Sequence, residues 1–455
     1  MASTYLTRTP SSTGNRKILT ISCWFKRSNV SSTQTLFANG GNSYNRDYIS
    51  LESNQLVVAR YDSAYIYQIK PNRVFTDTSS WYHLVVAFDT SEDSSDNRIK
   101  IYINGVRETS FATNTRPALN VDTWYNYAGY LQNIGVDYDN AGNDFNGLMS
   151  YVALVDGKAE LPTIFGETDS ATGQWKIKTS ITPSSGWGTN GFLILKNGNS
   201  VTDQSGNSNN FTVGGGTLTK TEDNPSNVFA TLNPLHIQGN TNRAITYGNT
   251  RFYTTSNAWG SILSTLGFSS GKFYVEAKIL GLDSSTGYGS IAIQDINAFG
   301  SSGNTDANLM GNNASAGLGL DYRSGESSLK ASNVTVSSNV ANFSDNDIIG
   351  MAIDMDNKAL YIHKNGTYYQ IGGVTGVPTS GASKTGAITI PTSIKTCAIG
   401  MGGYSGNADF CYNFGNGYFI STAVSSAGTN ASGNGIFEYD VPTGYTALST
   451  KGLNL

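Results

Sequence analysis

The chain is short of charge, and that shortage removes several classes of protein. Charged residues make up 14% of its 455 residues, with a net charge of −4, whereas soluble domains average roughly 25% charged residues. Nothing here offers the basic surface that nucleic acid requires. No stretch approaches the ~20 apolar residues of a membrane span, and MASTYLTRTPSSTGNRK at the start has no apolar signal core. The sequence therefore predicts no nucleic-acid partner, no membrane insertion and no signal peptide.

Cysteine is also scarce. Three cysteines cannot form a disulfide framework, and an odd number argues against a secreted, disulfide-stapled scaffold. Cys23 lies in LTISCWF in phase with Leu19, Ile21 and Phe25, which predicts a buried thiol. Buried free thiols are favoured for Cys397 and Cys411 too, and a disulfide between these two is the alternative.

What the chain does contain is a dominant period of two. Segments such as KILTISCWF, WYHLVVAFD, RIKIYING and KFYVEAKI alternate or run apolar between Gly, Asn, Asp and Ser clusters. The best candidate for a helix is SNAWGSILSTLGF at 256–268. Many short strands with frequent turns predict an all-β protein of stacked antiparallel sheets.

A loop-rich segment separates two strand-rich regions. Residues 161–245 are dense in Gly and Asn and poor in strand patterns, which is unusual inside a compact protein. We interpret this segment as a connecting strap, packed down by scattered aromatic residues, rather than as a free linker. The predicted organisation is therefore a first sandwich at 1–160, the strap at 161–245 and a second sandwich at 246–455.

Asn-Gly occurs at the end of an alternating run in both regions, as Asn104-Gly105 and Asn365-Gly366. Type I′ hairpin turns need φ > 0 at both positions, and Asn-Gly is the preferred pair. We therefore read both pairs as hairpin turns of one architecture built twice, not as part of an active site.

The motifs around the first hairpin resemble the laminin-G and concanavalin A-like family. The family has a WYH-apolar-D strand before a K-x-Y-x-NG hairpin, and WYHLVVAFD and RIKIYING follow that pattern within residues 17–155. Ser150 replaces the acid of the family's late strand. The resemblance implies a jelly-roll β-sandwich, a fold that also hosts glycosidases.

The second region resembles a SPRY domain over residues 250–455. SGKFYVEAKI, GMAIDMD and NFG follow the family's motifs in order. This family is also a concanavalin A-related sandwich whose loops at one end usually meet partners. The resemblance implies binding loops near 295–313 and 321–328, with Asn304 and Asn308 as candidate ligand-binding residues.

The order of the segments also resembles proteins of marine tailed bacteriophages. This likeness rests on GETD, TGQW, SGNSNNFTV and DNPSNVFATLNP lying between the two sandwiches. It implies a structural or host-attachment protein located in the virion, a homo-oligomer that contacts other virion proteins and binds host surface polysaccharide. A purely structural decoration or tail component is the alternative.

One aromatic cluster is the candidate ligand-binding site of the first sandwich. VDTWYNYAGY places Trp124, Tyr125, Tyr127 and Tyr130 in a loop-like stretch, and aromatic rings with polar neighbours suit sugars. Packing of these rings between domains or subunits is the competing interpretation.

Acidic residues suggest one metal site. DYDNAGND places Asp137, Asp139 and Asp144 around a glycine, like the start of a Ca²⁺ loop, although Leu148 stands where an EF-hand has its glutamate. The three aspartates are candidate Ca²⁺ ligands, with a solvated acidic loop as the alternative.

Catalytic patterns are weak. GFSSG at 267–271 matches the G-x-S-x-G sequence pattern of a nucleophile elbow, but it precedes a predicted strand rather than a helix. The carboxylate pair of a glycosidase is matched in spacing by Asp354 and Asp356, which precede a hairpin. The sequence therefore predicts a protein that is not an enzyme, with a glycan-cleaving enzyme as the less favoured alternative.

Overall fold

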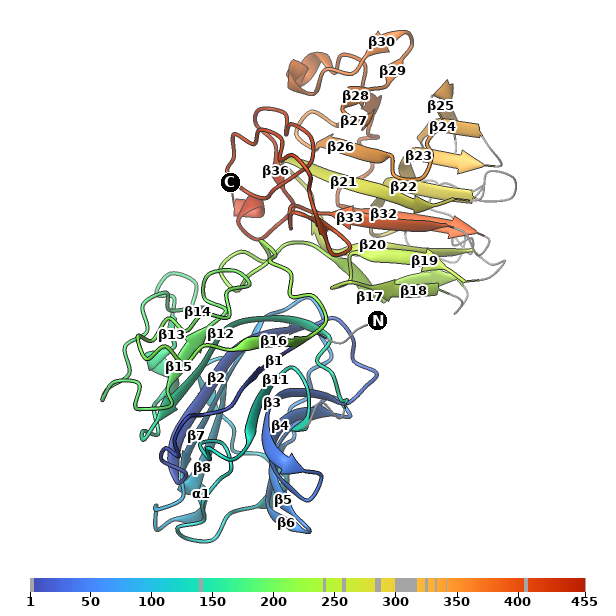
Figure 1. Cartoon of the computed structure of the whole chain (residues 1–455). Coiled ribbons are helices and arrows are strands. Elements are labelled where there is room, and N and C mark those ends of the chain that lie inside the picture. Colours follow the sequence, from blue (N-terminus) through green and yellow to red (C-terminus); the bar gives the residue numbers. More distant parts are fainter. Residues whose placement is uncertain are drawn as a thin grey trace. The chain divides into compact units, whose positions relative to one another are not determined.

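The computed structural model divides the chain into two compact units. Unit 1 comprises residues 1–220 and 224–226, and unit 2 comprises residues 221–223 and 227–455. Figure 1 labels the elements of both. Described residues are 4–138, 142–239, 243–255, 259–282, 288–298, 317–323, 326–331, 334–340, 342–404 and 408–454. In these ranges no helix is long and apolar enough to cross a membrane.

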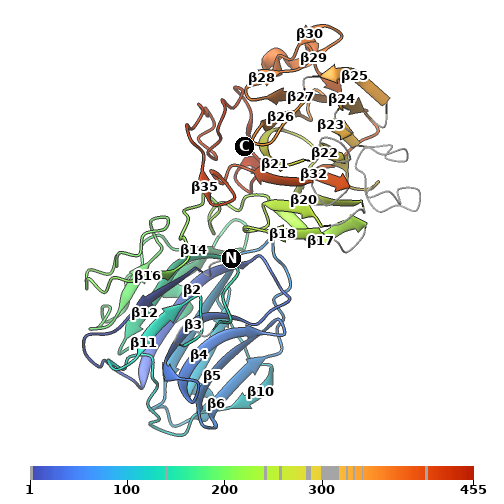
Figure 2. The same ribbon diagram turned by 45° about the vertical axis from the view of Figure 1, so that its right-hand side comes forward.

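Unit 1 is a sandwich of two antiparallel sheets. Sheet A has the order β10 (Phe111–Thr115), β6 (Tyr65–Pro71), β5 (Gln55–Asp62), β4 (Asn45–Glu52), β3 (Gln34–Asn42), β11 (Leu131–Ile134), β1 (Tyr5–Arg8) and β16 (Thr212–Gly215). Several of these strands run side by side in Figure 2. Sheet B has the order β15 (Phe192–Ile194), β12 (Gly147–Asp156), β2 (Ile18–Arg27), β7 (Tyr82–Asp89), β8 (Ile99–Ile103) and β9 (Val106–Arg107), with α1 (Ser95–Arg98) between β7 and β8.

Alternation along the strands of unit 1 builds its core. Leu19, Ile21, Cys23 and Phe25 of β2 all lie in the buried cluster between the sheets. The predicted burial of Cys23 is therefore confirmed. Cys397 and Cys411 are also buried and free, so the alternative of a disulfide between them is wrong.

The segment after the first sandwich packs on the outer face of sheet B. It contains η2 (Pro162–Ile164), β13 (Gly166–Thr168) and β14 (Trp175–Ile177), and its Phe165 is buried against Val85 and Tyr102. The Trp175 Nε1 donates a hydrogen bond to His83 Nδ1 at 3.0 Å. Residues 161–220 therefore belong to unit 1, because β15 and β16 also extend its two sheets.

Unit 2 is a second sandwich of antiparallel sheets. Its sheet G has the order β17 (Leu232–Gly239), β20 (Gly260–Phe268), β32 (Cys397–Tyr404), β22 (Tyr288–Asp295), β23 (Gly317–Arg323), β24 (Glu326–Ala331) and β25 (Val334–Val340). Its sheet H has the order β18 (Arg243–Thr246), β19 (Arg251–Thr254), β33 (Asp409–Asn413), β21 (Lys272–Gly281), β26 (Ile348–Asp354), β27 (Ala359–Lys364) and β28 (Thr367–Tyr368).

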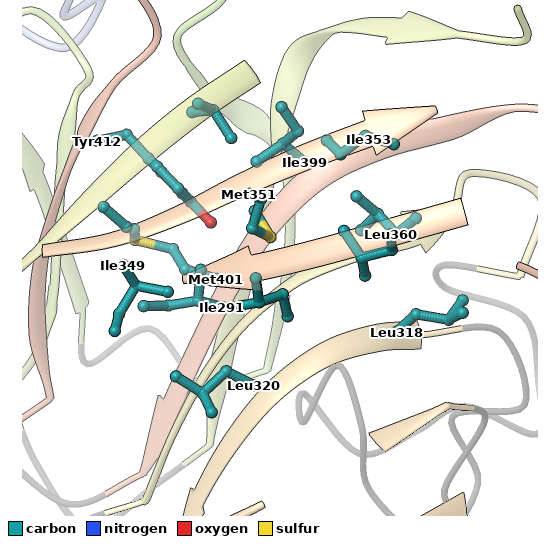
Figure 3. Packing of buried hydrophobic residues seen from close by; sticks show 14 of the residues in the cluster. Ile291, Leu318, Leu320, Ile349, Met351, Ile353, Leu360, Ile399, Met401 and Tyr412 are labelled. Atoms are coloured by element: carbon teal, nitrogen blue, oxygen red, sulfur yellow. The ribbon is translucent and has the colours of Figure 1, made fainter. Parts of the chain in front are cut away.

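Short elements complete unit 2, and they lie mainly in its C-terminal half. β31 (Ile388–Thr389) pairs with β27, and β36 (Thr446–Ala447) pairs in parallel with β21. The others are β29 (Gln370–Ile371), β30 (Val374–Thr375), β34 (Tyr418–Phe419), β35 (Thr422–Ala423), η3 (Pro378–Ser383) and η4 (Gly452–Asn454). Figure 3 shows the core of unit 2, where Ile291, Leu320, Met351 and Met401 pack closely. The predicted fold, all-β with two antiparallel sandwiches, is confirmed.

The expected helix at 256–268 is wrong. Its described part is strand β20, which pairs with β17 on one side and with β32 on the other. Ile262 lies in the core while Leu263 is buried on the opposite face. A strand that is covered on both faces loses the alternation that marks a half-buried strand, so its apolar residues had the spacing of a short helix.

Both Asn-Gly pairs form the predicted turns. Asn104 and Gly105 have φ of 48° and 80°, and Asn365 and Gly366 have φ of 48° and 83°. Each asparagine also caps a neighbouring strand in the same way: Oδ1 accepts from the backbone N–H of His83 in unit 1 and of Ile348 in unit 2, both at 2.8 Å. One hairpin design recurs in both sandwiches.

Candidate functional site

Three aromatic rings gather at one end of unit 1. Trp124, Tyr127 and Tyr130 lie in the loop between β10 and β11, and their ring centroids are 4.9–5.4 Å apart. All three rings are partly exposed. The loop therefore carries a cluster of partly exposed aromatic residues, and three of the four aromatic residues predicted from the sequence lie together.

The fourth predicted residue, Tyr125, points into the core instead. Its side chain is 0% exposed, and its ring lies 5.6 Å from Phe37 and 5.4 Å from Phe88. Tyr125 therefore anchors the loop to the sandwich and shares no surface with its neighbours. The sequence VDTWYNYAGY did not show which aromatic side chains are buried and which are exposed. The segment is a loop, and side chains in a loop do not alternate between faces as they do in a strand.

Two arginines hold the indole ring in place. Arg16 lies 4.5 Å from the Trp124 ring centroid and 5.0 Å from that of Tyr127, and Arg60 lies 4.6 Å from Trp124. Cations at these distances are attracted to the electron-rich ring faces. We call Trp124, Tyr127, Tyr130, Arg16 and Arg60 the aromatic end. Sequence reasoning missed both arginines, because they are far from Trp124 along the chain.

A buried carboxylate fixes the backbone of the same loop. Asp47 of β4 is fully buried and sits opposite Arg60 of β5. It accepts hydrogen bonds from the Tyr67 hydroxyl at 2.5 Å and from the backbone N–H of Trp124. Burial raises the pKa of Asp47 to about 6, and the hydrogen bonds and the nearby arginines partly oppose that rise. The position of Trp124 is therefore set by the sheet and not by the loop alone.

The predicted Ca²⁺ ligands do not form a preformed cage in the described part of the chain. Asp137 accepts from Arg46 Nη1 at 2.5 Å and from Asn143 Nδ2 at 3.2 Å, so its charge is already neutralised. Asp139 lies outside the described residues, and Asp144 has partners of its own. Among the described residues no group of three acids, histidines or cysteines could hold a metal. Ca²⁺ binding stays a prediction that requires displacement of the guanidinium of Arg46.

The binding residues expected in unit 2 fall outside the described ranges. This applies to Asn304 and Asn308 and to most of the loop at 295–313. The expected loop at 321–328 is wrong for its described residues, which belong to the paired strands β23 and β24. The described residues show another aromatic cluster, in which Trp259 lies 5.4 Å from Tyr288 and 5.2 Å from Tyr404. Tyr288 and Tyr404 are cross-strand partners on β22 and β32. Sequence reasoning missed this cluster because its members are far apart in the chain.

His83 of β7 and His363 of β27 are structural histidines. His83 is fully buried between Ser22, whose Oγ lies 2.9 Å from Nε2, and Trp175. Burial lowers the pKa of His83 to about 3 and that of His363 to about 4. GFSSG joins the strands β20 and β21, so Ser269 does not lie on the strand-to-helix turn of a nucleophile elbow.

A buried carboxylate also organises the C-terminal part of unit 2. Glu276 of β21 accepts from the backbone N–H groups of Glu438 and Tyr439 at 2.9 and 2.8 Å, from Tyr274 Oη at 3.1 Å and from Asn413 Nδ2 at 3.3 Å. Tyr274 Oη lies 2.7 Å from His363 Nε2. The carboxylate therefore holds the C-terminal segment against the outer face of sheet H.

Comparison with known proteins identifies the fold of the first unit. Residues 2–164 match the laminin G-type family model of the concanavalin A-like lectin/glucanases superfamily, in agreement with the resemblance noted for residues 17–155. The match covers about a third of the chain. No curated protein matches the chain.

Several solved structures are similar to parts of the chain. The SPRY domain of human HERC1 has 14% identity and a TM-score of 0.29, and the match covers 40% of this chain and 96% of that domain. Domain 4 of AbnA, an extracellular arabinanase from Geobacillus stearothermophilus, has 22% identity, coverage of 34% and 68%, and a TM-score of 0.27. The CBM40 of the Ruminococcus gnavus IT-sialidase has 13% identity, coverage of 32% and 78%, and a TM-score of 0.25.

Proposed function

We propose that this chain is a non-enzymatic virion protein of a tailed bacteriophage that binds a glycan of the host surface. The aromatic end of unit 1 is the binding site. The observation that carries the proposal is the gathering of Trp124, Tyr127 and Tyr130 on one loop, held in place by two arginines and a buried aspartate.

The chemistry of the aromatic end suits a sugar. The apolar faces of sugar rings pack on aromatic side chains, and sugar hydroxyls need hydrogen-bond partners at the edge of such a platform. Arg16 and Arg60 stack on Trp124 and pair with Asp122 and Asp62 at 3.5 and 3.3 Å. The rings are therefore pre-positioned, so little side-chain entropy is lost on binding.

Two further observations support the proposal. The family model that matches residues 2–164 is described as one of lectins and glucanases. The order of motifs between the two sandwiches resembles proteins of marine tailed phages, which supports a location in the virion. We expect the protein to contact other virion proteins and to form a homo-oligomer on the particle.

A glycan array tests the binding step. The full-length protein should bind one or more bacterial surface glycans, and Trp124→Ala should lose that binding. Tyr127→Ala is a milder second variant, which should weaken binding while leaving the buried contacts of the loop intact. Trp259→Ala is the matched control, because it removes an equivalent indole from the aromatic cluster of unit 2 and should leave binding unchanged. Hydrogen exchange of β4 and β5 confirms that the two unit 1 variants are folded, and exchange of β22 and β32 confirms it for Trp259→Ala.

Three results would redirect the proposal. Absence of binding by the wild-type protein would favour a purely structural decoration or tail component, with the rings buried in subunit contacts. Loss of binding in Trp259→Ala alone would move the site to unit 2. Release of reducing ends from a bound polysaccharide would identify a glycan-cleaving enzyme. An image of the assembled particle at moderate resolution tests the virion location separately.

A further inference from the structure

One buried arginine of unit 1 has only uncharged hydrogen-bond acceptors among the described residues. Arg27, the last residue of β2, is 0% exposed. Its Nη1 donates to Asn54 Oδ1 at 2.9 Å and to the Phe75 carbonyl at 2.6 Å. Asn54 lies on the turn between β4 and β5, so the guanidinium reaches from sheet B to the end of sheet A. These hydrogen bonds hold the side chain but do not neutralise its charge.

The other side of the same guanidinium carries two donors without acceptors. Nε and Nη2 of Arg27 are buried and have no hydrogen-bond partner in the described part of the chain. In an arginine side chain the Nε–H and one N–H of Nη2 point in the same direction and form a fork that binds anions in two places. Buried polar groups of native proteins nearly always have a partner, and an ordered water or an ion can serve as one. The fork of Arg27 is therefore built for an acceptor that the described residues do not supply.

Charge favours an anion over a water molecule as that acceptor. Within the described ranges no carboxylate forms an ion pair with Arg27, and the group that acts on it electrostatically is the hydroxyl of Tyr82. By contrast, Arg116, whose side chain is also largely buried, pairs with Asp96 at 3.5 Å. Burial lowers the pKa of Arg27 to about 10, so its guanidinium stays charged at neutral pH. An unpaired buried charge is strongly unfavourable, and a water molecule offers an acceptor without a counter-charge.

The surroundings of Arg27 are apolar. The rings of Phe25, Phe75 and Tyr82 pack on one another with centroids 5.1–5.8 Å apart, and Phe25 and Phe75 are completely buried. Phe25 precedes Arg27 on the same face of β2, and Phe75 supplies the carbonyl that Arg27 contacts. An environment of low dielectric constant strengthens the attraction between a guanidinium and an anion. Because the site is buried, the anion has to be small and has to enter when unit 1 folds or opens.

We infer that Arg27 binds a small monovalent anion, chloride, through Nε and Nη2 at the end of the sandwich core of unit 1. The ion supplies the counter-charge that the described residues lack, and it accepts the two hydrogen bonds of the fork. Its binding therefore stabilises the folded sandwich relative to the opened chain. The inference concerns a site separate from the aromatic end and does not depend on the proposed function.

Hydrogen exchange of β2 and β7 in the full-length protein measures this stabilisation. Sodium chloride replaces sodium gluconate at constant ionic strength and pH 7, because gluconate is too large for a buried site and constant ionic strength keeps general screening the same. A ligand that binds the folded state alone lowers the population of the opened state by mass action. Exchange through opening of unit 1 should therefore slow about tenfold when chloride rises to about ten times its dissociation constant.

Three variants separate a site at Arg27 from a general effect of salt. Arg27→Met removes the charge at similar length and should abolish the response of exchange to chloride. Arg27→Gln keeps a neutral donor and should also lack the response, which covers the case that Arg27→Met does not fold. Arg116→Met is the matched control, because it removes a buried arginine that has Asp96 as its partner, and it should respond to chloride like the wild type. A response of equal size in all four proteins would overturn the inference.

Bromide, which replaces chloride in such sites, locates the ion directly. Crystals of the full-length protein grown in sodium bromide should show an anomalous scattering peak beside Nε and Nη2 of Arg27, and crystals of Arg27→Gln should not. Absence of that peak in the wild type would overturn the inference, since water would then satisfy the two donors. A peak without chloride-dependent exchange would show an adventitious ion only and would also overturn it.

Discussion

Glu276 makes the stability of unit 2 depend on pH, with a sign that can be tested. Its carboxylate is fully buried, and burial raises its pKa to about 7, although four hydrogen-bond donors oppose the rise. A buried acid whose pKa is raised binds its proton more tightly in the folded state than in the unfolded chain. Its contribution is therefore fully present below pH 4.5 and is lost as the pH rises through 7.

The magnitude follows from the two pKa values of this residue. The difference between the ordinary value of 4.5 and about 7 corresponds to about 3 kcal/mol, because each pH unit is equivalent to about 1.4 kcal/mol. Glu276→Gln replaces the protonated acid by a neutral group of the same shape. The amide nitrogen of the variant faces hydrogen-bond donors, and that cost does not depend on pH. From pH 4.5 to above pH 7 the wild type should therefore lose about 3 kcal/mol of stability relative to the variant.

Hydrogen exchange in the full-length protein measures this difference. Peptides from β21 and from residues 434–441 report the opening free energy of unit 2 without interference from unit 1. Burial lowers the pKa of His363 to about 4 and raises the pKa of Tyr274. Both residues are present in both proteins, so their contributions to the pH dependence of stability largely cancel. A variant that is less stable than the wild type at pH 7 but equal to it at pH 4.5 would refute the reasoning. That result would mean that the four donors outweigh burial.

Three further predictions concern the turns, the buried histidine and the acidic loop. Asn104→Ala and Asn365→Ala should each destabilise their unit by about 1–2 kcal/mol, measured by hydrogen exchange, because each loses a strand cap and places alanine at positive φ; a loss in one unit only would contradict the shared design. His83 should remain neutral in NMR titrations from pH 7 to 5, since burial lowers its pKa to about 3; protonation near pH 6 would show that it is accessible. If Ca²⁺ binds at Asp137, Arg46→Ala should tighten that binding several-fold in calorimetry, because the competing cation is removed; weaker binding would place the ion elsewhere.

Local patterns in the sequence predicted most of the fold. The alternation of Ile99, Ile101 and Ile103 placed one face of a strand in the core, and all three residues are buried there. The failure at β20 has a physical reason, since a strand covered on both faces carries no period of two. Local patterns also could not predict where unit 1 ends along the chain. Its strand β16 joins sheet A by pairing with β1, which lies some 200 residues earlier.

The candidate site, like the fold, was predicted only in part from the sequence. VDTWYNYAGY by itself determined that aromatic rings would gather in one loop, because those residues are adjacent in the chain. Only the tertiary structure decided that Tyr125 faces the core and that Arg16 and Arg60 stack on Trp124. Those contacts join residues that are tens of positions apart in the chain. They depend on strand register and burial, and a local sequence pattern encodes neither.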